Sequence, residues 1–199
     1  MLRAAIAFAV LAATATPAWP CLNGTILEGD EAVRAIVQIE RFLDAGQYGQ
    51  ARELLGSSSG SEVHWMNEAV TGRVGDAEMV LALRTAPRRA AKIAVDYFAK
   101  RSKAQPKNLR YQAWLAEAYA TLNKREEALS ILTDLHKRDL MPDGFAYVTL
   151  AKLSDGVKVD EWLDVCRTRA KVKSICVIPT AARAAPARKV RSSKMKLPG

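Results

Sequence analysis

Residues suited to nucleophilic or metal chemistry are few and widely separated in this 199-residue sequence. It contains two histidines, His64 and His136, and three cysteines, Cys21, Cys166 and Cys176. A cysteine nucleophile needs an adjacent histidine and a third group that orients the histidine, and the spacing indicates no such set. No C-x-x-C or H-x-x-x-H spacing occurs, so the sequence predicts no zinc site.

The acidic pairs Asp30-Glu31, Glu126-Glu127 and Asp160-Glu161 each stand where a helix is expected to begin. Carboxylates are favoured there by the free N–H groups and the helix dipole. His136 falls in the last turn of an expected helix, where a cation is favoured. Because these positions have structural explanations, we expect a protein that is not an enzyme, with no catalytic residue, metal or cofactor.

The cysteines could form a disulfide if the protein is exported to an oxidising compartment. Cys166 and Cys176 are close enough in sequence to join the last expected helix to the segment after it. That pairing leaves Cys21 over, and pairing of Cys21 with either of the others stays open. A further alternative is that Cys166 is a small buried apolar residue without a disulfide.

Residues 1–18 have the pattern of a secretory signal peptide, with Arg3, an apolar run over 4–13 and a small-x-small site that predicts cleavage at about Ala18. The apolar run is shorter than a membrane span requires. The sequence therefore predicts export to the periplasm or the extracellular space. A lipid-anchored Cys21 is the less favoured alternative, because bulky residues precede it where small ones are needed.

The formal net charge of +9 belongs mainly to the C-terminus. Excluding Arg3 and the six cations after residue 180 leaves 23 cations against 21 acids, a charge of +2. Residues 181–199 contain no acid and little to bury, so we expect a disordered basic tail. Such a tail could contact anionic lipid or polymer, with nucleic acid less expected, or have no function. Its cations are Arg183, Arg188, Lys189, Arg191, Lys194 and Lys196.

Two amphipathic helices joined by a tight turn are expected between Pro106 and Pro142. The first has one apolar stripe at helical period, and the second buries a shorter one before it ends in basic residues. Asn123 separates them, and asparagine tolerates the left-handed backbone of a helix end. The two stripes are Tyr111, Trp114, Leu115, Ala118, Tyr119 and Leu122, then Ala128, Ile131, Leu132 and Leu135.

Further helices are expected on both sides of this unit. Asp30 is expected to cap a helix that ends at Gly46, and a later helix is expected to end at Gly72. Asp76 is expected to cap the helix after that. Pro87 is expected to begin the following helix, with Ile93 on its buried face. Asp143 should cap a helix that ends near Gly156, and the last should begin near Asp160. The predicted layout is 1–18 signal peptide, 19–29 connector, 30–56 helical hairpin, 57–75 loop and helix insertion, 76–172 helical array, 173–180 extended segment and 181–199 tail.

The central unit resembles the tetratricopeptide repeat, a pair of antiparallel helices recurring about every 34 residues. The residues that carry the resemblance are Leu115, Ala116, Tyr119 and Ala128. The sequence departs from the repeat pattern at three positions. Trp114 lies two places after the position of the aromatic residue in the pattern, and Pro142 lies two places after that of the terminal proline. Leu132 stands where the pattern has an aromatic residue.

The chain also shows self-similarity at this period. Ala94 lies 34 residues before Ala128 and is followed at the family spacing by Phe98 and Pro106, whereas Trp162 replaces the alanine 34 residues later. The resemblance covers roughly residues 76–170. It implies an all-α fold of antiparallel hairpins stacked as a short right-handed solenoid.

The resemblance implies a protein or peptide partner on the helical surface, hence an interaction or scaffold module of the cell envelope or extracellular space. The alternative is an envelope-surface protein that acts through its basic tail. Positions expected to be exposed for a partner are Arg110, Gln112, Ala113, Glu117 and Thr121 on the 109–122 helix, and Tyr147 and Lys152 on the 143–153 helix.

Overall fold

The computed structural model describes the backbone of residues 20–58 and 68–178 and the side chains of 31–57 and 70–178. Across these ranges it contains α-helices, one short 3-10 helix and no strand, so the predicted all-α class is confirmed. The elements are α1 (Pro20–Asp44), α2 (Tyr48–Ser58), α3 (Glu68–Thr85), α4 (Pro87–Ala104), α5 (Leu109–Thr121), α6 (Arg125–Lys137), α7 (Gly144–Leu153), α8 (Val157–Arg169) and η2 (Lys173–Ile175).

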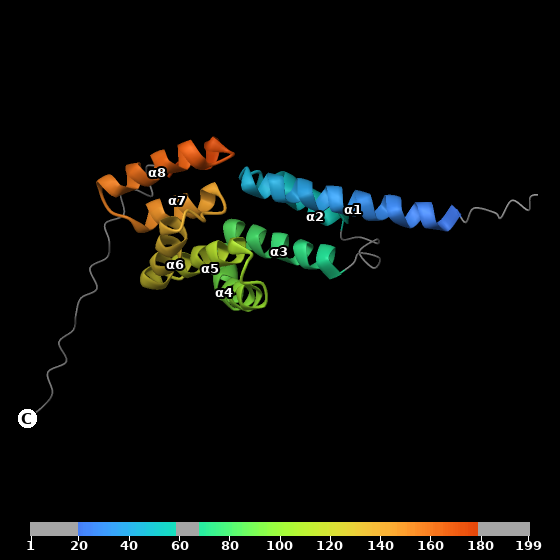
Figure 1. Cartoon of the computed structure of the whole chain (residues 1–199), viewed down its shortest axis with the longest axis horizontal. Coiled ribbons are helices and arrows are strands. Elements are labelled where there is room, and N and C mark those ends of the chain that lie inside the picture. The colour runs from blue at the N-terminus through green and yellow to red at the C-terminus, as the bar shows by residue number, and fades with distance from the viewer. Residues whose placement is uncertain (1–19, 59–67, 179–199) are drawn as a thin grey trace, which may run out of the picture.

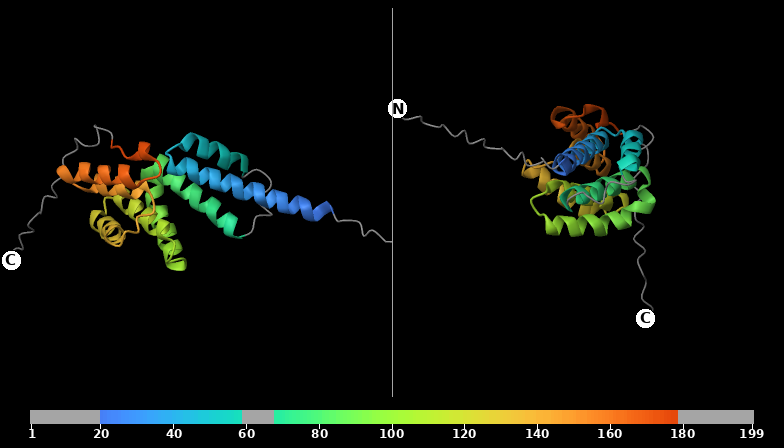
Figure 2. Two further views of the ribbon diagram at one scale, coloured as in Figure 1. Left: turned by 45° about the horizontal axis from the view of Figure 1, so that its top comes forward. Right: turned by 90° about the vertical axis from the view of Figure 1, so that its right-hand side faces the viewer.

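Helices that follow one another in the chain pack together in pairs along an elongated molecule (Figure 1). The pairs are α1 with α2, α3 with α4, α5 with α6, and α7 with α8, and a turn of one to three residues joins the two helices of each pair. α1 also packs against α3, α4 against α5, and α7 against both α5 and α6. α1 and α3 run in the same direction, as the left view of Figure 2 shows.

Local residue chemistry accounts for several helix ends. Pro87 occupies the first turn of α4, where its missing N–H costs nothing. The Asp143 carboxylate caps α7 by accepting a hydrogen bond from the Ala146 N–H at 3.0 Å. Gly46 and Asn123 have positive φ angles of 72° and 59° at the turns after α1 and α5. The two central helices and their turn thus form as expected.

The expected connector at 19–29 and the Asp30 cap are wrong. α1 begins at Pro20 and continues without a break to Asp44. Asp30 lies inside the helix, so helix propagation there overrides a side chain that would also suit a helix start.

The expected helix stop at Gly72 and cap at Asp76 are also wrong, because α3 runs through both positions. A Cβ atom added at Gly72 would lie 3.0 Å from the Arg101 guanidinium, and one at Gly75 would lie 3.1 Å from the Tyr97 hydroxyl. These glycines therefore make room for side chains of α4 and do not mark a turn. The boundary placed between residues 75 and 76 consequently falls inside a helix.

Three smaller expectations need correction. Ile93 is 61% exposed and does not belong to the buried face of α4. α8 begins at Val157, a few residues earlier than expected. Part of the expected extended segment is the 3-10 helix η2. The expected loop begins later than residue 57, because α2 continues to Ser58. The signal peptide, residues 59–67 of that loop and the basic tail lie outside the described residues.

The core consists of three clusters that follow one another along the chain. Residues of α1 to α5 form the largest cluster, α5 to α7 form a second, and α7, α8 and residues 176–178 form a third. Ala91, Ala94 and Ala128 are fully buried, and their small side chains allow neighbouring helices to approach closely. Phe98 is also fully buried and packs against the Trp114 ring.

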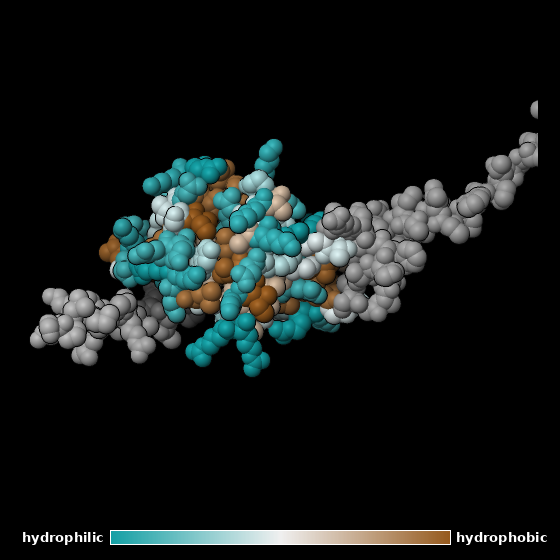
Figure 3. All heavy atoms as spheres, turned by 90° about the horizontal axis from the view of Figure 1, so that it is seen from below, coloured by the Kyte–Doolittle hydropathy of each residue, from teal (hydrophilic) through white to brown (hydrophobic). Residues whose placement is uncertain are grey.

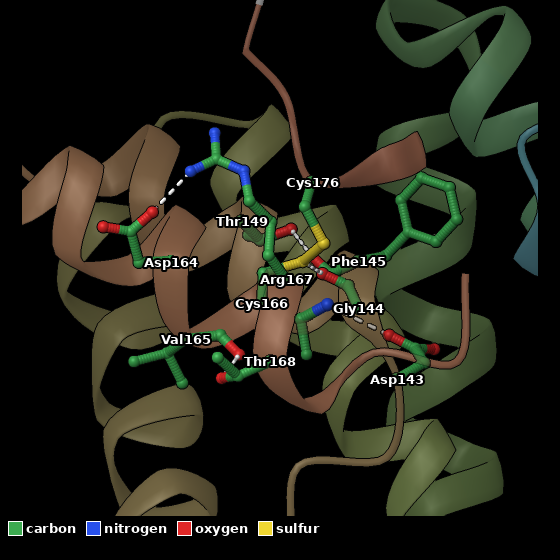
Figure 4. The surroundings of a disulfide bond; sticks show 11 residues. Asp143, Gly144, Phe145, Thr149, Asp164, Val165, Cys166, Arg167, Thr168 and Cys176 are labelled. Carbon is green, nitrogen blue, oxygen red and sulfur yellow. Dashed lines mark hydrogen bonds and ion pairs between the residues drawn. A yellow bond between two sulfur atoms is a disulfide. The ribbon is translucent and has the colours of Figure 1, made fainter. Parts of the chain in front are cut away.

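A disulfide joins Cys166 of α8 to Cys176 just after η2, with an S–S distance of 1.99 Å (Figure 4). Both cysteines are completely buried. This is the pair named from the sequence, and the side chain of Cys21 lies outside the described ones. The bond holds residues 173–178 against α7, where Ile175 lies close to Gly144.

Replacing both Cys166 and Cys176 by alanine should lower the free energy of unfolding by roughly 2–4 kcal/mol, because the unfolded chain loses its cross-link. Denaturant titration of the oxidised protein and the variant measures this difference. Non-reducing peptide mass spectrometry should find the two cysteines linked, whereas free thiols at both positions in the oxidised protein would contradict the assignment.

Candidate functional site

A cleft of about 230 Å³ lies between α1, α3 and α5. These are the first helices of three successive pairs. Its apolar wall includes Leu43, Ala77 and Val80, and its aromatic residues are Tyr111 and Trp114. Its charged residues are Glu40, Asp44, Arg73, Asp76 and Arg110. The cleft thus combines both signs of charge with an apolar wall.

Ion pairs across the cleft join its helices. The Arg73 guanidinium of α3 donates two hydrogen bonds to the Glu40 carboxylate of α1, at 2.9 and 2.8 Å. Arg110 of α5 pairs with Asp44 of α1 and lies 3.9 Å from Glu40. The Arg110 guanidinium also lies 5.6 Å from the centre of the Trp114 ring. These side chains remain about one-quarter to one-third exposed, so a ligand could reach them.

Asp76 is buried beneath the cleft and accepts four hydrogen bonds. Tyr97 donates at 2.8 Å and the Arg101 Nε at 2.9 Å to one carboxylate oxygen. Tyr111 donates at 2.7 Å and the Arg101 Nη2 at 2.8 Å to the other. A buried carboxylate is stable when its lone pairs are used in this way. The network therefore joins α3, α4 and α5.

The electrostatics of the cleft follow from burial and pairing. Burial raises the pKa of the Asp44 carboxyl, and the neighbouring Arg110 only partly offsets this effect. The hydrogen bonds to Glu40 raise the pKa of the Arg73 guanidinium. The cleft is smaller than the roughly 300–1,000 Å³ of most cofactor and drug-sized sites. It is large enough for one or two side chains of a bound segment.

Arg84 lies behind the cleft and contacts three other helices. Its side chain is 3% exposed and forms a salt bridge of 3.1 Å with Glu117 of α5. It donates a hydrogen bond of 3.2 Å to the Leu43 carbonyl at the end of α1, and lies 3.6 Å from the centre of the Phe145 ring of α7. Burial lowers the pKa of this guanidinium, but the surrounding charges and hydrogen bonds, chiefly those of Glu117, together outweigh burial and raise it.

Figure 4 shows Phe145 pointing away from the disulfide. The Arg84 guanidinium lies over the Phe145 ring. The four first helices of the pairs, α1, α3, α5 and α7, are therefore joined at one buried cation.

Of the residues expected to face a partner, Arg110 lines the cleft. Glu117 is paired with Arg84, and the Thr121 hydroxyl donates to the Glu117 carbonyl at 2.9 Å. Gln112 is half-buried and lies outside the cleft, and Lys152 is exposed on α7.

The expectation that Tyr147 and Ala113 are exposed is wrong, because they are only 3% and 4% exposed. α7 packs against α5, α6 and α8, which leaves it almost no free face. Amphipathic spacing cannot find the exposed side of a helix that is covered all round.

Sequence reasoning missed Glu40, Asp44, Arg73 and Asp76. One signal was present: Glu40 and Arg73 are 33 residues apart, as are Arg84 and Glu117, and both pairs form ion pairs. Opposite charges separated by about one repeat are expected to meet when first helices stack side by side. Asp76 gave no such signal, because its partners lie at unequal spacings.

Within the described residues, no group of three or more histidine, cysteine, aspartate or glutamate side chains is placed to hold a metal. No helix in that part of the chain is long and apolar enough to cross a membrane. The six cations of the C-terminal tail lie outside it.

Replacing Arg84 by methionine should lower the free energy of unfolding by about 3–5 kcal/mol, because Glu117 is left without its cation in a largely buried site. The matched control is Arg125→Met, which removes an exposed pair with Asp155 and should cost less than about 1 kcal/mol. Denaturant titration measures both, and equal losses would show that Arg84 is an ordinary surface charge.

Stability should fall as pH rises from about 10 to about 12. Burial, and then the hydrogen bond to Asp76, raises the pKa of Tyr111 to about 12, and the same causes raise the pKa of Tyr97. In the unfolded chain tyrosine ionises near pH 10, so its ionisation favours unfolding above that pH. Below it this contribution is fully present.

Denaturant titrations across that pH range check this expectation. The Tyr97→Phe/Tyr111→Phe variant should lose much of the alkaline dependence. An unchanged dependence in the variant would contradict the assignment of these two hydroxyls.

Comparison of the chain with protein-family models, curated proteins and solved structures gave no match. Its function must therefore be inferred from its own residues. Among the described residues, the charged side chains between α1, α3 and α5 combine access for a ligand with groups that can bind it.

Proposed function

We propose that the four helix pairs form a short right-handed solenoid like that of tetratricopeptide repeats. Three observations support this. Each second helix of the first three pairs packs on the next first helix, and first helices also pack together from α1 to α3 and from α5 to α7. Ala94 and Ala128, 34 residues apart, are both fully buried. The ion pairs Glu40–Arg73 and Arg84–Glu117 both span 33 residues.

We further propose that the chain is a non-catalytic interaction module that binds an extended protein or peptide segment in the cleft. The carrying observation is that three successive first helices place partly exposed carboxylates and guanidiniums around one opening, with Tyr111 and Trp114 in its wall. Solenoid proteins use such surfaces to hold extended partners. A ligand's charged side chain can replace one partner of an internal ion pair, and the displaced partner, which is already partly exposed, can turn to water.

A catalytic role has less support from the same residues. General acid–base catalysis needs a group with a suitable pKa that can reach a substrate proton. Glu40, Asp44 and Asp76 each face an arginine in the folded chain. Proton transfer would first require one of these pairs to separate.

We also propose that this binding takes place in the cell envelope or the extracellular space. The signal-peptide pattern of residues 1–18 favours the cell envelope or the extracellular space. An alternative function is contact of the basic tail, residues 181–199, with an anionic lipid or polymer, favoured by six cations without an acid among them.

Selection of peptides from a random display library on the full chain tests binding in the cleft. The Glu40→Gln/Arg73→Gln variant removes both charges of one pair while keeping similar shapes. It should bind the selected peptides about tenfold more weakly or worse, since each lost charge-assisted hydrogen bond is worth about 1.5–3 kcal/mol.

The control Arg125→Gln/Asp155→Asn removes a matched exposed pair far along the chain and should bind as the parent does. Circular dichroism checks that each variant is folded. If deletion of 181–199 abolishes binding and the cleft variant retains it, the tail is the binding element and the cleft proposal fails.

A further inference from the structure

The outer face of α4 concentrates positive charge on the folded part of the chain. Its exposed side chains include five cations, and a sixth follows shortly after the helix. Asp96 is the single acid among the exposed positions of α4. The six cations are Arg88, Arg89, Lys92, Lys100, Lys103 and Lys107.

These cations have no ion-pair partner within the part of the chain that the structure describes. Arg101 provides a contrast on the same helix, since it turns inward and pairs with Asp76 at 2.8 Å. Residues 4–180 carry a formal charge of only +2, so a face with six cations and one acid is a strong local excess.

The face is continuous because its members recur at helical spacing. Arg89, Lys92, Asp96, Lys100 and Lys103 follow one another at intervals of three or four residues. The opposite side of α4 carries buried alanines and Phe98, which pack on α3 and α5. A helix of 18 residues is about 27 Å long, so the cations are spread along a line.

An apolar side chain lies in the middle of this basic face. Ile93 is 61% exposed, the second largest exposure among the large apolar residues described. α4 lies at the lower edge of the molecule (Figures 1 and 2), and the view from below shows mainly hydrophilic side chains with apolar patches between them (Figure 3). Cations attract the phosphate groups of anionic lipid, and an exposed aliphatic side chain can add apolar contact with the bilayer.

We propose that the outer face of α4 docks onto a bilayer surface rich in anionic phospholipid, with the helix axis parallel to the surface. The cations would lie among the phosphate groups while Ile93 enters the boundary of the acyl chains. Nucleic acid fits less well, since single strands are usually held on exposed aromatic rings. On α4, Phe98 is fully buried and the Tyr97 hydroxyl is bonded to Asp76.

The proposal is independent of peptide binding. The cleft is formed by α1, α3 and α5, and no residue of α4 lines it. A protein held through α4 would therefore keep the cleft free, and the two sites can be tested separately.

The test uses the full chain and vesicles of phosphatidylcholine with roughly one part in three of phosphatidylglycerol, followed by sedimentation. Lys92→Gln/Lys100→Gln/Lys103→Gln should weaken partitioning on the order of 100-fold, because each cation near an anionic surface contributes roughly fivefold. Ile93→Ser should weaken it severalfold without any change in charge. Parent binding should fall steeply with salt and be absent on pure phosphatidylcholine.

The matched control neutralises three exposed cations elsewhere, Lys137→Gln/Lys152→Gln/Lys158→Gln, and should partition like the parent. Equal losses in the two triple variants would overturn the proposal, since net charge alone would then explain binding. No loss in the α4 variant would assign binding to the tail. Binding of the parent to a short single-stranded DNA or to polyglutamate, with none to the vesicles, would also overturn it.

Discussion

The arrangement of this chain depends on a cation placed where water cannot reach it. The Arg84 side chain of α3 forms an ion pair with Glu117 and a hydrogen bond to the Leu43 carbonyl, and it lies over the Phe145 ring. One side chain therefore contacts α1, α5 and α7. An arginine has five donors in a fixed plane and stays charged at any physiological pH, which suits it to this position better than lysine. Burying it is costly unless all three neighbours are in place, so the contact specifies how successive helix pairs sit on one another.

A buried charge also joins helices at the middle of α3. Asp76 is buried with four hydrogen bonds from α4 and α5, and Gly72 and Gly75 leave the space in which Arg101 and Tyr97 approach. A buried anion in the middle of α3 and a buried cation near its C-terminus thus hold this helix against its neighbours. The more exposed pairs of Glu40 with Arg73 and Asp44 with Arg110 line the cleft. A ligand site needs accessible charged groups that are held in place by buried, fully bonded ones, and Asp76 and Arg84 supply this support.

Much of the helical framework could be predicted because it depends on local chemistry. The stripe from Tyr111 to Leu122, the turn at Asn123 and the cap at Asp143 need only period, backbone preference and one side-chain hydrogen bond. The glycines of α3 led to the wrong prediction of a helix end, because glycine suits both a turn and a close contact between helices. Only the side chains of α4 that pack against them decide between the two. The cleft could not be predicted from residue types alone, because Asp76 looks like a helix cap until Tyr97, Arg101 and Tyr111 are brought around it. Tyr147 was misjudged for a related reason, since α7 is covered on every side.

The central claim is that a buried charge pair between α3 and α5 sets the spacing of the first helices. The most direct measurement is a double-mutant cycle of Arg84→Met and Glu117→Gln, read from denaturant titrations of the parent, both single variants and the double variant. Coupled buried charges predict an interaction energy of about 1.5–3 kcal/mol, with the double variant less destabilised than the two single losses added together. Additive losses, within about 0.5 kcal/mol, would contradict the account and would mean that apolar packing alone positions these helices.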